Sequence, residues 1–239
     1  MLRPRRAALP PWVWLRRLFV AILGLNIALI GAGVAVVPAT LSSPLGLATL
    51  LADVAMQSVL ATLALAGPWS FRRVRASIGI SGALGLVFAA LYLGIILLEF
   101  AGVNDNLNIL ALFVLVAGVA GAVASYRTRR WQSGPLAAIW ALVIGTGLWS
   151  AGILLINYVS WGSHQQYVFW LNDGAIDAFW RSGSRDLNVF LLQDVQGALF
   201  FHPLLSMVVG AIGGMIGGSV ARGSIGLHRW VVERERSEG

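Results

Sequence analysis

The chain has no cysteine, no lysine and few charged side chains of any kind. Without cysteine it cannot form disulfides or hold zinc or an iron–sulfur cluster through sulfur. Only 11% of its 239 residues are charged and 58% are hydrophobic, against about 25% and about 45–50% in ordinary soluble domains. This composition excludes an ordinary soluble domain and predicts an integral membrane protein.

Several motifs of catalysis are also missing. The three histidines, His164, His202 and His228, are far apart, and there is no His-Glu-x-x-His pair for a metalloprotease and no bis-histidine pattern for haem. There is no Gly-rich phosphate loop for ATP hydrolysis. The sequence therefore predicts no metal site, no cofactor and no enzyme of these classes.

Six long apolar runs are present, each near the roughly 20 residues that cross a bilayer as a helix. We expect an all-α, polytopic membrane bundle that forms a single membrane domain over 1–239. The predicted helices cover 18–37, 45–67, 78–98, 107–125, 136–159 and 203–221.

Arginines alternate along the connections between these runs. All but two of the 17 basic residues fall in the 1–17 segment, in alternate short turns or in the 222–239 tail. The positive-inside rule then places both termini in the cytoplasm, as a multi-pass protein of a bacterial inner membrane. The basic charge predicts contact with anionic lipids at the cytoplasmic face, with no nucleic-acid partner. The "RRLFV" stretch is typical of twin-arginine export signals, but its apolar run suits an uncleaved first helix.

The connection 160–202 is the one long outer segment. A loop of this length without structure is unusual, so we expect an outer aromatic subdomain of short interfacial helices, the second capped by Ser184 and stopped near Pro203. In this prediction three aromatic side chains face lipid or a partner, namely Trp170, Phe179 and Trp180.

Two short turns resemble each other. The stretch from Ser70 aligns with that from Ser125, which favours a duplicated helix pair, although basic turns between membrane helices also match by chance.

One carboxylate lies inside an apolar run. Asp53 shares a helix face with Thr49 and Gln57, at steps of four residues. A carboxylate at mid-membrane depth costs about 2.5–3.5 kcal/mol and is a functional hypothesis by default. The alternative is a protonated Asp53 that hydrogen-bonds Gln57 or Asn26 and locks two helices together.

Other polar residues are predicted near the outer helix ends. Glu99, Asn157 and His202 would form a polar mouth above Asp53, or are simply solvated helix ends.

The last apolar run carries a glycine zipper. Ser206, Gly210, Gly214 and Gly218 recur every four residues, and small residues at this spacing let two backbones approach closely. Internal packing against a neighbouring helix is favoured over a dimer interface.

These patterns favour a non-catalytic accessory or scaffold component that works with other membrane subunits. The alternative is a transporter or channel for a small cation, proton or polar solute that uses Asp53. A lipid-handling enzyme that uses Glu99 or His202 is a third and weaker hypothesis.

Overall fold

The structure is a computed structural model that describes residues 11–66, 75–101 and 109–238. Every regular element in these residues is helical, which confirms the predicted all-α class. The elements in chain order are α1 (Pro11–Val36), the short 3-10 helix η1 (Pro38–Ser42), α2 (Pro44–Ala66), α3 (Arg75–Phe100), α4 (Ile109–Thr128), α5 (Ser133–Val159), α6 (His164–Asn172), α7 (Ala175–Ser182) and α8 (Leu187–Glu238).

Six of the described helices, α1 to α5 and α8, are long and apolar enough to span a membrane. The chain is therefore a multi-pass membrane protein. Helices suit this environment because all their backbone polar groups are hydrogen-bonded within the helix. For α1 to α5 the predicted bounds differ from the observed ones by a few residues, the largest difference being at the beginning of α1.

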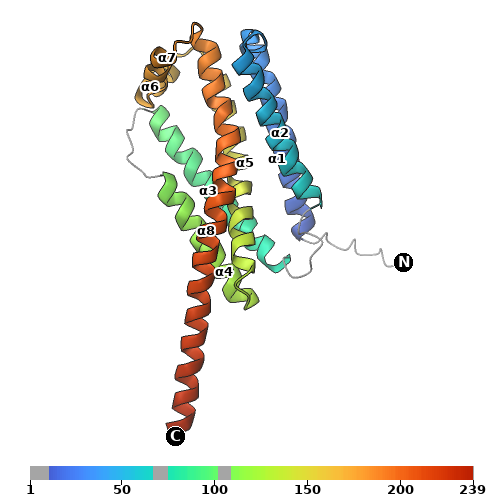
Figure 1. Ribbon diagram of the computed structural model, residues 1–239, viewed down its shortest axis with the longest axis vertical. Helices are drawn as coiled ribbons and strands as arrows, with labels where there is room; N and C mark the ends of the chain where they lie inside the picture. Colours follow the sequence, from blue (N-terminus) through green and yellow to red (C-terminus); the bar gives the residue numbers. More distant parts are fainter. Residues whose placement is uncertain (1–10, 67–74, 102–108, 239) are drawn as a thin grey trace, which may run out of the picture.

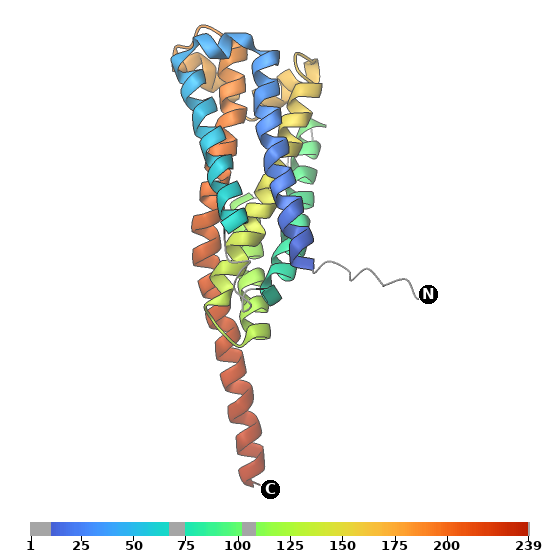
Figure 2. The ribbon, with the colours of Figure 1, turned by 90° about the vertical axis from the view of Figure 1, so that its right-hand side faces the viewer.

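The long helices run side by side and alternate in direction (Figure 1). The start of α1 and the end of α8 lie toward one end of the bundle, here called the terminal end, together with the turn between α4 and α5. The opposite end, here called the loop end, carries η1, α6 and α7 (Figures 1 and 2). The placement of the terminal end in the cytoplasm remains a prediction.

Helix α5 is the centre of the bundle and contacts α1, α3, α4 and α8. In its most apolar stretch 72% of the residues are buried, against 22% for α2 at the periphery. Small residues allow the central contacts: a methyl group at Gly85 would lie 2.7 Å from the Ala141 carbonyl oxygen. The α3–α4–α5 core is aromatic, with Phe88 and Phe113 edge to face at 4.7 Å between ring centroids.

The outer faces of the spanning helices carry many exposed aliphatic side chains. Exposed leucines and valines occur on α1 to α5 and on α8, for example Leu51, Leu91 and Leu115. Such extensive apolar surface is abnormal for a protein in water and suits lipid chains.

Helix α8 corrects the prediction of a separate helix over 203–221. It continues through Pro203 without a break (Figure 2). Proline is tolerated in membrane helices because nearby side chains help to satisfy freed backbone groups. Next to Pro203, His202 Nδ1 lies 2.9 Å from the Ala198 carbonyl oxygen, and the Ser206 hydroxyl donates to the His202 carbonyl at 2.8 Å. Neither of these is the Leu199 carbonyl that loses its N–H donor at Pro203.

The beginning of α8 also differs from the prediction. The Asp186 carboxylate accepts a hydrogen bond from the Val189 backbone N–H at 3.0 Å, so Asp186 rather than Ser184 caps the helix. The predicted outer subdomain over 160–202 therefore ends where α8 begins, and the predicted tail over 222–239 continues the spanning helix as far as Glu238.

The short helices α6 and α7 pack on the loop end of the bundle. Phe169 stacks on Phe100 of α3 at 4.2 Å between ring centroids. Trp170 and Phe179 are buried, which corrects the prediction that they face lipid or a partner, whereas Trp180 is 74% exposed. The position of these helices at a membrane interface stays a prediction.

Candidate ion-binding cluster

The first two helices are joined by a polar contact inside the bundle. Asn26 of α1 and Gln57 of α2 are both fully buried, and the Asn26 amide donates to Gln57 Oε1 at 3.4 Å. The same Asn26 amide donates to the Gly147 carbonyl oxygen of α5 at 3.0 Å. Asn26 therefore links α1 to α2 and to α5.

Asp53 lies one turn from Gln57 on the same face of α2, and it is also fully buried. Among the described residues, neither of its carboxylate oxygens has a hydrogen-bond donor. The hypothesis that Asp53 itself bonds Gln57 or Asn26 is therefore wrong for this structure. The polar link between α1 and α2 is made by Gln57 instead.

Two further polar side chains approach from α5 and α8. Gln196 of α8 is fully buried, and its amide lies 3.5 Å from the Ile30 carbonyl oxygen of α1. The Tyr158 hydroxyl of α5 lies beside that amide without a hydrogen bond of good geometry, and within electrostatic range of Asp53. Both groups meet α1 at Gly33, where a methyl group would lie 3.0 Å from the Gln196 nitrogen.

These residues form the Asp53 cluster, defined as Asn26, Asp53, Gln57, Tyr158 and Gln196. Most of its polar atoms have no hydrogen-bond partner among the described residues: Asn26 Oδ1, Asp53 Oδ1, Asp53 Oδ2, Gln57 Nε2, Tyr158 Oη and Gln196 Oε1. All but one are oxygens. Because a buried polar atom without a partner costs about 1–3 kcal/mol, this concentration points to a site with a function beyond packing.

Thr49 contributes less than its spacing predicts. It is half-buried, and its hydroxyl donates to the Leu45 carbonyl oxygen within its own helix at 3.0 Å. It shares the face of Asp53 without joining the cluster through a hydrogen bond.

The structure does not bring the predicted outer mouth together. Asn157 is fully buried and bonded to Gln166 of α6 at 3.0 Å. His202 lies deep in α8 because that helix begins at Leu187, and its Nε2 lies 2.8 Å from the Tyr92 hydroxyl. Glu99 is half-buried near the end of α3. The prediction that Glu99, Asn157 and His202 form one outer mouth is therefore corrected, because the three side chains lie at separate, largely internal positions.

The glycine-rich face of α8 packs inside the chain. A methyl group at Gly210 would lie 2.7 Å from Ile139 Cα, one at Gly214 2.7 Å from Pro135 Cα, and one at Gly218 2.8 Å from the Ser125 hydroxyl. The Ser206 hydroxyl donates to Thr146 of α5 at 3.3 Å. The face therefore lies against α4 and α5, as expected for internal packing.

Sequence reasoning missed Tyr158 and Gln196. The signal for Gln196 was its place in an amphipathic segment, but the expected stop at Pro203 assigned that segment to an outer helix.

The Ser70 turn of the predicted repeat falls outside the described residues. The duplication therefore stays a prediction.

No protein-family model matches the chain, and neither the curated proteins nor the solved structures include a match.

Proposed function

We propose that the chain is a transport protein of a cell membrane for a small monovalent cation or a proton, with Asp53 as the ion-binding group. The observation that carries this proposal is the fully buried Asp53 carboxylate whose two oxygens have no donor among the described residues. A residue kept only to join helices would be hydrogen-bonded, as Asn26 and Gln57 are to each other.

The chemistry of the cluster favours a single positive charge. Its unpartnered oxygens come from one carboxylate, two amides and one phenol, and oxygens of this kind are ligands for hard cations. Calcium sites usually supply more than one carboxylate. Among the described residues no group of three acidic or histidine side chains is placed to hold a metal ion. One carboxylate therefore suits a monovalent cation or a proton.

The cluster is closed in this conformation. Asn26, Asp53 and Gln57 have no exposed surface, which argues for a transporter with an occluded site over an open channel. Because α2 is peripheral and contacts mainly α1 and α8, we expect the α1–α2 pair to move against α5 and α8 when the site opens.

The test is ion flux in liposomes that contain the purified full-length protein. Gradients of sodium, potassium and protons are applied in turn to the wild type, to Asp53→Asn and to Asp177→Asn, the last an exposed carboxylate on α7. We expect flux of one of these ions through the wild type and Asp177→Asn, and none above empty liposomes through Asp53→Asn. Equal flux through all three proteins would remove Asp53 from the mechanism.

A second candidate is an accessory or scaffold role in a membrane assembly. The observation that favours it is the length of α8, whose 52 residues extend about 78 Å at 1.5 Å per residue. Its end projects alone from the terminal end (Figure 1). A single short stretch of helix is marginal in water, so a partner subunit would stabilise this projection.

Native mass spectrometry after extraction in mild detergent separates the two candidates. Stoichiometric foreign subunits that are lost when the chain is cut after Gly226 would support the scaffold role. A lone monomer or homo-oligomer would favour transport. Neither candidate is an enzyme, and we propose no catalytic role.

A further inference from the structure

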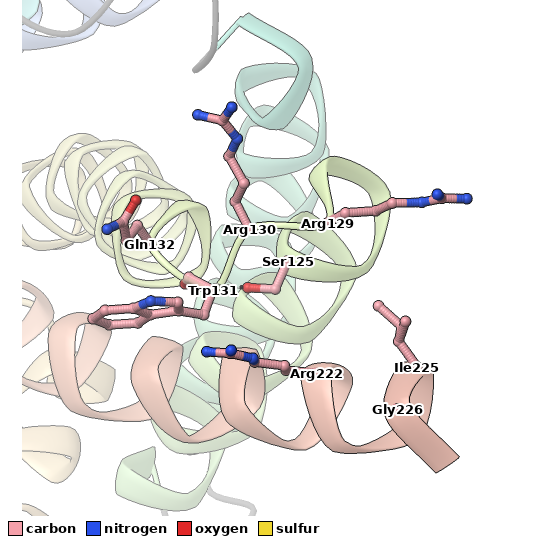
Figure 3. Close-up of a pocket in the computed structure, with 8 residues that line it drawn as sticks. All are labelled: Ser125, Arg129, Arg130, Trp131, Gln132, Arg222, Ile225 and Gly226. Carbon is pink, nitrogen blue, oxygen red and sulfur yellow. Dashed lines mark hydrogen bonds between the residues drawn. The ribbon is translucent and has the colours of Figure 1, made fainter. Parts of the chain in front are cut away.

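A second polar site lies at the terminal end, far from the Asp53 cluster. A cavity of about 520 Å³ opens between the α4–α5 turn and α8 (Figure 3). This volume is within the range of about 300–1,000 Å³ for small-ligand sites. Its polar lining comes from Ser125, Arg129, Arg130, Trp131, Gln132 and Arg222.

The fold places these arginines together from two distant segments. Arg222 follows Gly214 and Gly218 at steps of four residues, so it continues the α8 face that packs on α4 and α5. Gly218 lies against the Ser125 hydroxyl and the Trp131 carbonyl oxygen. The close approach of the two backbones therefore brings Arg222 beside the turn.

The turn itself has an unusual residue at its first position. Arg129 follows the last residue of α4 with a φ of 55°, a left-handed conformation that favours glycine or asparagine at this place. It is the only non-glycine residue with positive φ in the described part of the chain. Strain of this kind is concentrated at functional sites, and here it places an arginine at the cavity.

The cavity is strongly basic. Of the described residues that line it, three are arginines and none is acidic. In Figure 3 the side chains of Arg129 and Arg130 diverge, while Arg222 extends toward Trp131. The three guanidinium groups do not converge in this structure, and a bound anion would attract each of them.

We propose that this cavity binds a phosphate-bearing anion, in the first place the headgroup of an anionic phospholipid. The guanidinium group is suited to phosphate because its planar set of donors matches two phosphate oxygens. Trp131 is 44% exposed at the same rim, and tryptophan prefers the headgroup level of a bilayer. Arg222 is the first charged residue of α8 after Asp194, and we expect a basic residue that ends so long an uncharged stretch to lie at the headgroup level. This site is independent of Asp53 and of ion transport.

The test compares two triple variants with the same net charge. One removes the cavity arginines through Arg129→Gln, Arg130→Gln and Arg222→Gln. The matched control removes three exposed arginines outside the cavity, through Arg127→Gln, Arg181→Gln and Arg185→Gln. Delipidated full-length protein in mild detergent is titrated with phosphatidylglycerol and with phosphatidylcholine, and bound lipid is counted by native mass spectrometry.

We expect the wild type and the control to bind phosphatidylglycerol in preference to phosphatidylcholine. Each cavity arginine contributes roughly fivefold in affinity, so the cavity triple should bind on the order of 100-fold more weakly. If that triple does not fold, as judged by gel filtration, Arg222→Gln alone is compared with Arg127→Gln.

Inorganic phosphate distinguishes the two sources of the ligand. If it does not displace phosphatidylglycerol at millimolar concentration, the ligand is the lipid headgroup. If it competes and binds alone, the site takes a soluble phosphate compound. Equal affinity of the cavity variants and their controls for phosphatidylglycerol would overturn the site.

Discussion

Two buried polar clusters of the bundle differ in how fully their polar atoms are hydrogen-bonded. In the first, Gln166 of α6 donates to the Asn157 carbonyl oxygen at 2.9 Å and to its side-chain oxygen at 3.0 Å, and accepts from the Gly162 N–H at 2.9 Å. The Asn157 amide donates to the Ile153 carbonyl oxygen at 2.9 Å. Every polar atom of these two side chains has a partner. In the Asp53 cluster most have none among the described residues.

The number of satisfied hydrogen bonds, and not burial, distinguishes a structural polar cluster from a candidate functional one. Asn157 and Gln166 are as fully buried as Asp53 and Gln57, so burial alone does not distinguish the clusters. Native proteins satisfy nearly all their buried polar groups, and exceptions require an explanation. We interpret the first cluster as the link between α5 and α6, and the second as the candidate ion-binding site proposed above.

The largest loss of stability is expected from a substitution on the packed glycine face of α8, and it gives a reference for substitutions in the two clusters. Gly214→Leu should destabilise the protein by at least about 3 kcal/mol, at the top of the range for overpacked cores, because the new side chain meets Pro135 and Ala138. Gly223→Leu on the same helix meets nothing within 4 Å and serves as the control. Thermal unfolding in mild detergent measures both, and equal tolerance would contradict the close packing of this face.

The satisfied cluster should be the more sensitive of the two to an apolar substitution. Gln166→Leu removes the hydrogen-bond partner of Asn157 Oδ1 and of the Gly162 N–H, and it leaves the Asn157 carbonyl oxygen with only a long bond from the Ser160 hydroxyl at 3.4 Å. The expected loss of unfolding free energy is about 2–3 kcal/mol. Gln165→Leu, at an exposed neighbouring position, should change it little. If both variants unfold alike, the hydrogen bonds of Gln166 do not support the fold.

In the Asp53 cluster an apolar substitution should raise the unfolding free energy instead of lowering it. Asp53→Leu replaces a buried carboxylate without a donor by an apolar side chain, which should raise the unfolding free energy by about 1–2 kcal/mol while it abolishes ion flux. A loss of stability comparable to that of Gln166→Leu would show that Asp53 is structural, and the comparison would fail.

The smallest effect is expected at Gln57. Its side chain accepts one long hydrogen bond from Asn26, while its own amide nitrogen has no partner among the described residues. The two contributions oppose each other, so Gln57→Leu should change the unfolding free energy by less than about 1 kcal/mol. A larger loss in the same unfolding assay would make the Asn26–Gln57 contact the main link between α1 and α2.

The sequence predicts the spanning helices well because their apolar length is a local property. It also predicts that Asn26 approaches the polar face of α2, since intramembrane polar groups turn toward one another, and in the structure Asn26 bonds Gln57 on that face. It does not predict Gln196, because the helix-stopping rule for proline applies in water and fails at Pro203 inside this bundle. The same error placed His202 at a rim. Tyr158 of α5 reaches Gln196 because both side chains pack against Gly33 of α1. This contact between distant segments cannot be predicted from a local sequence pattern.

The Asp53 cluster is proposed to bind a monovalent cation or a proton, and such binding would change the stability of the folded protein. A ligand that binds the folded state stabilises it by about 2.7 kcal/mol at a concentration of 100 times its dissociation constant. The decisive measurement is the unfolding temperature of the wild type, Asp53→Asn and Asp177→Asn in rising sodium or potassium chloride, against choline chloride of equal ionic strength, and over a range of pH. If Asp53 binds the ion, one of these cations, or the proton, raises the unfolding temperature of the wild type and Asp177→Asn but not of Asp53→Asn. The same response in all three proteins would contradict ion binding at Asp53.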